Sequence, residues 1–125
     1  MRILIVEDDR AARSGLEKWL IKQGHSVCWA ETGERAIEQL KFGEIDLVVL
    51  DLNLGEGSMS GWDVARYKYG DAKLRKIPIV VVTGLSTEDV HAGAKVNVFE
   101  GQSLILPKPV DLRMLAAYLK SLIPL

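Results

Sequence analysis

The sequence predicts an α/β fold in which helices cover both faces of a parallel β-sheet. Short runs rich in β-branched apolar residues alternate along the chain with stretches that have helical spacing. Several of the short runs are apolar without alternation, as expected for strands that are covered on both faces. Repeated strand–helix units with short connections favour parallel strands, because each helix returns the chain to the starting edge of the sheet.

Five segments are predicted to be strands because they are short, apolar and rich in valine, isoleucine and leucine. They are residues 3–6, 27–30, 46–50, 79–82 and 104–106. Turn-forming or charged residues border most of these segments.

The stretches between the strands carry apolar residues three or four positions apart, which indicates amphipathic helices. The predicted stripes are Leu16, Trp19 and Leu20, with Gly24 ending the helix; Ala36, Ile37 and Leu40, with Thr32 as N-cap; Trp62, Ala65 and Tyr69; a less regular stretch that opens at residues 87–90; and Leu112, Leu115, Leu119 and Leu122, with Asp111 near the start. Five strand–helix units result.

Five units in 125 residues fit a flavodoxin-like (βα)5 fold, a doubly wound parallel sheet with strand order 2-1-3-4-5. No linker rich in proline or glycine and no shift in composition divides the chain. We therefore expect a single domain over residues 1–125, with no output domain after the last helix.

Composition excludes several classes of protein. Apolar residues make up 48% of the chain and charged residues 26%, with a net charge of −1, so nothing favours nucleic acid or an anionic membrane as a partner. Cys28 is the one cysteine, which excludes an internal disulfide and a multi-cysteine zinc site. The apolar runs are too short to span a bilayer, and no signal peptide is evident. We expect a cytoplasmic protein.

Polar residues follow four of the predicted strands. Ligands of an open parallel sheet bind beyond the carboxyl ends of its strands, so these residues are candidates for one site. They are Glu7, Asp8 and Asp9 after the first strand, Asp51 after the third, Thr83 after the fourth and Lys108 after the fifth. Any one of them has a simpler reading, since Asp8 or Asp9 alone is typical of a helix N-cap. Their joint placement favours a functional site.

The chemistry of this group points to phosphate and a hard cation. Carboxylates brought close together repel one another unless a cation or a proton intervenes. A ligand set of oxygens with high negative charge suits Mg²⁺. Thr83 can donate to a phosphoryl oxygen and Lys108 can neutralise one. Asp51 is then either a further metal ligand or a nucleophile that forms an acyl phosphate.

The sequence resembles the receiver domain of two-component response regulators over essentially its whole length. Four motifs carry the resemblance: residues 3–9 (ILIVEDD), 48–51 (VVLD), 80–84 (VVVTG) and 106–109 (LPKP). The resemblance implies a signalling phosphoacceptor rather than an enzyme. It also implies that a histidine kinase or a histidine phosphotransfer protein donates the phosphoryl group, and that the output is a contact with a downstream protein.

The resemblance also assigns roles to individual residues. It implies Asp51 as phosphoacceptor, Asp8 as a direct Mg²⁺ ligand, Glu7 as a ligand through water, the backbone carbonyl of Asn53 as a further ligand, Thr83 as switch hydroxyl and Lys108 as the phosphoryl contact. Arg13 and the spacing from Asp8 to Asp51 match the family pattern in this register, which makes Asp9 a neighbour. The Lys108–Pro109 bond is expected to be cis.

The chain departs from the family pattern in several places. Ile105 stands where an aromatic switch residue is usual, and the loop 53–61 and the stretch 83–108 are longer than usual. The fourth helix is expected to be short or shifted. This affects the expected partner surface, which the fourth helix, the fifth strand and the last helix form. Leu85, an apolar residue two positions after Thr83, predicts slow autodephosphorylation.

Other functions remain open. A phosphorylation-silent receiver that serves as a docking scaffold is favoured by Ile105 and opposed by the intact acidic motif. A Mg²⁺-dependent phosphohydrolase is disfavoured because Asn53 stands where a second acid is needed. A flavin or nucleotide binder is disfavoured because residues 7–9 would repel a phosphate. Whether phosphorylation drives formation of a homodimer is not decided by the sequence.

Simple structural roles are expected for the remaining conspicuous residues. His25 and His91 are isolated and are not expected to bind metal. The three tryptophans, Trp19, Trp29 and Trp62, are spread along the chain and are expected to pack rather than to stack on bases. The basic residues after the third strand are expected to form a solvated helix face; they are Arg66, Lys68, Lys73, Arg75 and Lys76.

Overall fold

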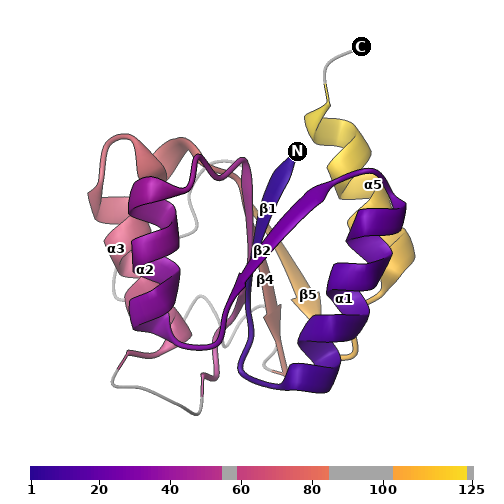
Figure 1. The fold of residues 1–125 in the computed structure, drawn as a ribbon, viewed down its shortest axis with the longest axis horizontal. Coiled ribbons are helices and arrows are strands. Elements are labelled where there is room, and N and C mark those ends of the chain that lie inside the picture. Colours follow the sequence, from indigo (N-terminus) through magenta and orange to yellow (C-terminus); the bar gives the residue numbers. More distant parts are fainter. Residues whose placement is uncertain (55–58, 85–102, 124–125) are drawn as a thin grey trace.

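Strands and helices alternate along the chain as the sequence predicts (Figure 1). The computed structural model describes residues 1–54, 59–84 and 103–123. Its elements are β1 (Arg2–Val6), α1 (Arg10–Lys22), β2 (Ser26–Ala30), α2 (Gly33–Phe42), β3 (Leu47–Asp51), α3 (Gly61–Gly70), the short 3-10 helix η1 (Leu74–Lys76), β4 (Ile79–Thr83), β5 (Ser103–Pro107) and α5 (Leu112–Leu122). The expected fourth helix, Leu85 and His91 lie outside the described residues, as do residues 55–58 of the loop.

The five strands form one parallel sheet in the order β2-β1-β3-β4-β5, which confirms the predicted topology. All five residues of β3 and of β4 are buried, in keeping with their unbroken apolar runs. β3 lies one residue later than predicted at both ends. Asp51 is therefore the last residue of the strand rather than the first residue after it.

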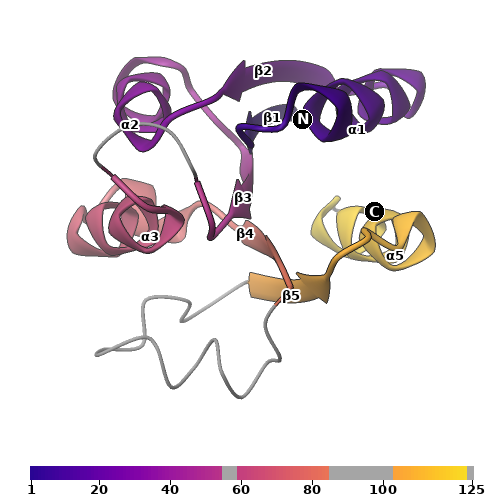
Figure 2. The same cartoon turned by 90° about the horizontal axis from the view of Figure 1, so that it is seen from below.

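Helices cover both faces of the sheet. In Figure 2, α1 and α5 lie on one face, and α2 and α3 lie on the other. The alternation of side chains along each strand divides the core accordingly. Ile3 and Ile5 of β1 pack in the cluster with Leu115 of α5, whereas Leu4 and Val6 pack in the opposite cluster with helices α2 and α3.

The helix ends follow the predicted capping residues. The Thr32 hydroxyl accepts a hydrogen bond from the backbone N–H of Arg35 at the start of α2. Asp111 caps α5 in the same way. Gly24 adopts a φ of 93° after α1, a conformation that a residue with a side chain rarely adopts. These caps fix where each helix leaves the sheet.

Two side chains, Lys68 and Leu112, lie elsewhere than predicted, and a third, Trp29, has an unusually high exposed fraction for a large apolar residue. Lys68 is only 5% exposed, because it projects from the inner side of α3 and donates to the backbone oxygen of Arg75. Trp29 is 44% exposed, because β2 lies at the edge of the sheet. Leu112, placed on the buried stripe of the last helix, is 39% exposed. Among the described helices, none is long and apolar enough to cross a bilayer.

Candidate functional site

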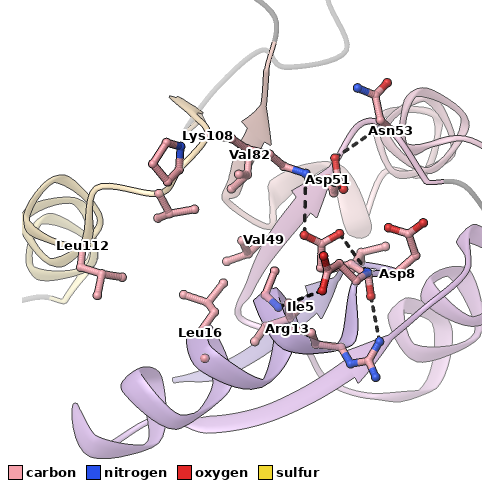
Figure 3. A pocket seen from close by; sticks show the side chains of 17 residues that line it. Ile5, Asp8, Arg13, Leu16, Val49, Asp51, Asn53, Val82, Lys108 and Leu112 are labelled. Carbon is pink, nitrogen blue, oxygen red and sulfur yellow. Dashed lines mark hydrogen bonds and ion pairs between the residues drawn. The ribbon is translucent and has the colours of Figure 1, made fainter.

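The parallel sheet brings the predicted polar residues to one rim. Glu7 directly follows β1, Asp51 ends β3, Thr83 ends β4 and Lys108 directly follows β5. Because all these strands run in the same direction, their carboxyl ends meet at one edge. Figure 3 shows Asp8, Asp51, Asn53 and Lys108 around the mouth of a single pocket.

Asp51 lies at the centre of this rim and is 3% exposed. Its Oδ2 is 3.0 Å from the ammonium nitrogen of Lys108. Its Oδ1 accepts a hydrogen bond of 3.0 Å from the backbone N–H of Asn53. A buried carboxylate needs such partners, because an unpaired charge in the interior is costly. Both oxygens of Asp51 are thus held in fixed directions.

The Lys108 ammonium lies between two carboxylates, since it is also 3.7 Å from Oε1 of Glu7. Burial lowers the pKa of Lys108, but the hydrogen bond and charge of Asp51, with the charges of Glu7 and Asp8, outweigh it and raise the pKa overall. The backbone helps to aim this side chain. The N–H of Lys108 donates to the Thr83 carbonyl at 2.9 Å. The Lys108–Pro109 bond is cis, as predicted.

Glu7, Asp8 and Asp51 form a cluster of carboxylates. One oxygen of each lies within 4.8 Å of the others. Burial raises the pKa of Glu7 to about 7; a hydrogen bond and charge repulsion with Asp51 add to this, while Lys108 and the Asp9 N–H oppose it. Gathered oxygens with this excess of negative charge fit a hard divalent cation such as Mg²⁺. The backbone of Asn53, the remaining predicted ligand, adjoins Asp51.

Asp9 has a different role from its two acidic neighbours. Its carboxylate caps α1 by accepting hydrogen bonds from the backbone N–H groups of Ala11 and Ala12 at 2.9 and 3.2 Å. This is the simple N-cap expected for an acid at the start of a helix. The Asp9 carboxylate is thus engaged at the start of α1.

Thr83 and Ile105 occupy the two strands on the other side of Asp51. Thr83 is fully buried at the end of β4. Ile105 of β5 pairs with Val81 of β4 and packs against the cluster that includes Ile79. An aliphatic side chain therefore fills the position where the family pattern has an aromatic one.

Arg13 has a structural role in the site that the sequence did not predict. It is 8% exposed, and its Nη1 donates to the backbone oxygen of Glu7 at 3.0 Å. Its guanidinium carbon lies 4.1 Å from the centre of the Trp29 ring, a cation–π contact. The signal was present in the sequence, because Arg13 stands three positions before Leu16 on the apolar stripe of α1, where a charged residue needs a partner.

The pocket at this rim has a volume of about 1000 Å³ and two different ends. Its acidic end is formed by Glu7, Asp8 and Asp51. Its apolar end runs between α1 and α5, where Leu16 and Leu112 line it (Figure 3). This explains the exposure of Leu112, which borders the pocket instead of the core.

Comparison with known proteins agrees with this architecture. The model of the response regulator receiver domain matches residues 3–120. The chain is 37% identical over 103 residues to the cell cycle transcriptional regulator CtrA of Caulobacter vibrioides, a match that covers 81% of this chain and 40% of that protein. This chain thus spans less than half the length of that relative.

Solved structures show the same fold. The signal receiver domain of a signal transduction histidine kinase from Syntrophus aciditrophicus is 28% identical, with a TM-score of 0.82, and the match covers 97% of this chain and 88% of that one. A two-component response regulator from Clostridium difficile is 27% identical, with a TM-score of 0.82 and coverage of 98% and 94%. The chain belongs to the response regulator receiver family of two-component signalling.

Proposed function

We propose that Asp51 accepts a phosphoryl group, with Mg²⁺ bound at the rim, from a histidine kinase or a histidine phosphotransfer protein. The observation that carries this proposal is the placement of a buried carboxylate beside both the Lys108 ammonium and two further acids at the mouth of a pocket. In this proposal, residues 1–125 form a single phosphoacceptor domain. The domain is proposed to act in the cytoplasm.

The transfer exchanges one bond at phosphorus for another. One carboxylate oxygen of Asp51 attacks the phosphorus of a phosphohistidine on the donor. The new O–P bond forms as the N–P bond breaks, and the imidazole nitrogen takes back the bonding electrons together with a proton from solvent. The product is an acyl phosphate on Asp51, and the chain acts as a phosphoacceptor rather than as an enzyme that turns over a substrate.

Residues of the rim divide the remaining tasks. Asp8 would hold Mg²⁺ directly, Glu7 through water, Asp51 by a carboxylate oxygen and Asn53 by its backbone carbonyl. Mg²⁺ bound by these oxygens would offset the negative charge that gathers as the phosphoryl group approaches Asp51. The Lys108 ammonium, which already lies 3.0 Å from Asp51, is near enough to neutralise a phosphoryl oxygen.

Thr83 would convert phosphorylation into a change of shape. Its hydroxyl, at the end of β4, would donate to a phosphoryl oxygen on Asp51 and so alter the start of the following segment. The downstream protein would meet the surface that includes β5 and α5. Ile105 would follow this change through its packing, because it has no hydroxyl to donate.

The test is the intact mass of the protein after incubation with acetyl phosphate, with and without Mg²⁺. We expect one added phosphoryl group that requires Mg²⁺ and is lost in Asp51→Asn. Asp9→Asn is the matched control: it removes an adjacent acid while keeping a good N-cap, and it should be phosphorylated like the original chain.

Two results would overturn the proposal. A folded protein with no adduct in Mg²⁺ would favour the silent docking scaffold. Steady release of phosphate without a detectable adduct would favour a phosphohydrolase. If the adduct forms, the same assay with a phosphorylated histidine phosphotransfer protein tests the class of donor, since transfer must deplete the phosphohistidine as it labels Asp51.

A further inference from the structure

β2 is an edge strand with one side open. It pairs with β1 on one side, and no other strand of the described residues lies beyond it (Figure 1). An open edge exposes backbone donors and acceptors that can pair with another extended chain. Which backbone groups of β2 are exposed follows from its hydrogen bonds to β1.

The bonds at the two ends of β2 fix this alternation. The N–H of Ser26 donates to the oxygen of Met1, and the oxygen of Ala30 accepts from the N–H of Glu7, both at 3.0 Å. In a parallel ladder, every second residue turns both of its backbone groups toward the same neighbour. The groups of Val27 and Trp29 therefore point away from β1, and no bond from them to another described residue is found.

A groove runs along this open edge, with a volume of about 440 Å³. We call it the β2 groove; its lining comprises Val27, Cys28, Trp29, Ala30 and Glu31 with Glu17 of α1 and Arg35, Glu38 and Gln39 of α2. Residues of both helices thus line the groove together with the edge strand. Trp29, 44% exposed, offers an aromatic surface to a bound side chain.

The charged residues that line the β2 groove favour a ligand with positive charge. Glu17, Glu31 and Glu38 line it, opposed by Arg35 alone among the charged lining residues. A segment that carries lysine or arginine would complement this excess of negative charge. A second copy of the chain, paired edge to edge, would instead bring two acidic grooves together.

We propose that the β2 groove binds an extended, basic segment of a partner protein, which adds a strand beside β2. The backbone of Val27 and Trp29 supplies the hydrogen bonds, and the acidic lining supplies the preference for basic side chains. This surface lies apart from Asp51, and the proposal does not depend on phosphorylation.

The test uses three blocked hexapeptides and the ¹⁵N-labelled protein. The first alternates lysine and valine, the second alternates glutamate and valine, and the third is the lysine peptide with methylated amide nitrogens. We expect the lysine peptide to shift the amide signals of Val27 and Trp29 and to protect these amides from hydrogen exchange. The other two peptides should leave both signals unchanged.

A charge-reversing pair of variants completes the test. Glu38→Lys in the groove should weaken binding of the lysine peptide about threefold or more, whereas Glu44→Lys, an exposed acid outside the groove lining, should have no effect. Equal binding of the methylated peptide, equal binding of the glutamate peptide or indifference to Glu38→Lys would each overturn the proposal. So would shifts of Val27 and Trp29 that depend on protein concentration alone, which would indicate a dimer.

Discussion

The ammonium nitrogen of Lys108 lies 3.0 Å from Oδ2 of Asp51, although the two residues are 57 positions apart in the sequence. Each residue stands at the carboxyl end of its own strand, so the pairing is a consequence of the parallel sheet. Lys108 supplies positive charge beside two of the rim carboxylates, those of Asp51 and Glu7. This position leads to the first prediction.

Lys108→Met is expected to raise the affinity for Mg²⁺ and to lower the rate of phosphorylation. Without the ammonium, the carboxylates have less positive charge beside them, so Mg²⁺ should bind several-fold more tightly by calorimetry. The rate of phosphorylation by acetyl phosphate should nevertheless fall about 100-fold or more, because a group that stabilises the transferring oxygens is lost. Lys22→Met, at an exposed lysine, serves as the control. A variant that binds Mg²⁺ and reacts as the original chain does would refute this role for Lys108.

Gly61→Ala is expected to disturb Asp51 from outside the site. A Cβ at Gly61 would collide with the backbone oxygen of Asp51 and with Leu52, where α3 begins against the end of β3. The free energy of unfolding should fall by about 1–3 kcal/mol, and the phosphorylation rate should fall with it. Gly70→Ala is the matched control in the same helix, because its Cβ would meet no atom within 4 Å. Urea denaturation and the acetyl phosphate assay measure both effects; equal behaviour of the two variants would contradict the prediction.

Lys68→Met is expected to stabilise the protein at neutral pH. Burial lowers the pKa of Lys68 from 10.5 to about 8, so the folded state holds this proton less tightly than the unfolded chain does. Folding stability should therefore rise with pH between about 8 and 10.5, and below this window the full cost of burying the charge is present. Removing the charge should add about 1–3 kcal/mol to the free energy of unfolding at pH 7.

The comparison of Lys68→Met with the original chain should be made by urea denaturation across this range of pH. The advantage of the variant should disappear as the pH approaches 10.5, where the unfolded lysine also loses its proton. Lys73→Met, at an exposed lysine of the same region, should show no such trend. An advantage that does not change with pH would show that packing rather than charge is responsible.

Arg13→Lys is expected to weaken the hydrogen bond that holds the backbone of Glu7 in position. Lysine keeps the positive charge but loses the planar group that stacks on Trp29 and donates to the Glu7 carbonyl. Mg²⁺ affinity should fall about tenfold, as is usual when a residue that orients a metal ligand is replaced. The emission of Trp29 should change as well. Arg10→Lys, at the exposed start of α1, should alter neither; unchanged Mg²⁺ binding in Arg13→Lys would count against the positioning role.

Much of the fold was predictable because its signals are local. Short, valine-rich apolar runs such as residues 79–82 favour buried strands, and the strand order followed from the number of units. The site was predictable in the same way, since the ends of parallel strands must meet at one edge. Asp51, Lys108 and Glu7 lie together for that reason.

The remaining features depend on packing between elements, which a single sequence does not reveal. Lysine is usually found on the surface of a protein. The burial of Lys68 results from how α3 and η1 pack together. Tryptophan is largely buried in most proteins. The exposure of Trp29 results from the edge position of β2. Leu112 continues an apolar stripe, yet it borders a pocket because α5 stands apart from α1 at that point.

The two backbone groups of Glu7 connect the acidic rim to the edge of the sheet. Its N–H donates to Ala30 at the end of β2, and its carbonyl accepts from Arg13, which stacks on Trp29. A molecule that displaces Trp29 and a cation that binds Glu7 would therefore both affect the contacts that Arg13 makes with these two residues. Thermodynamic linkage requires the two effects to be reciprocal. If one ligand changes the affinity for the other by some factor, the second ligand changes the affinity for the first by the same factor.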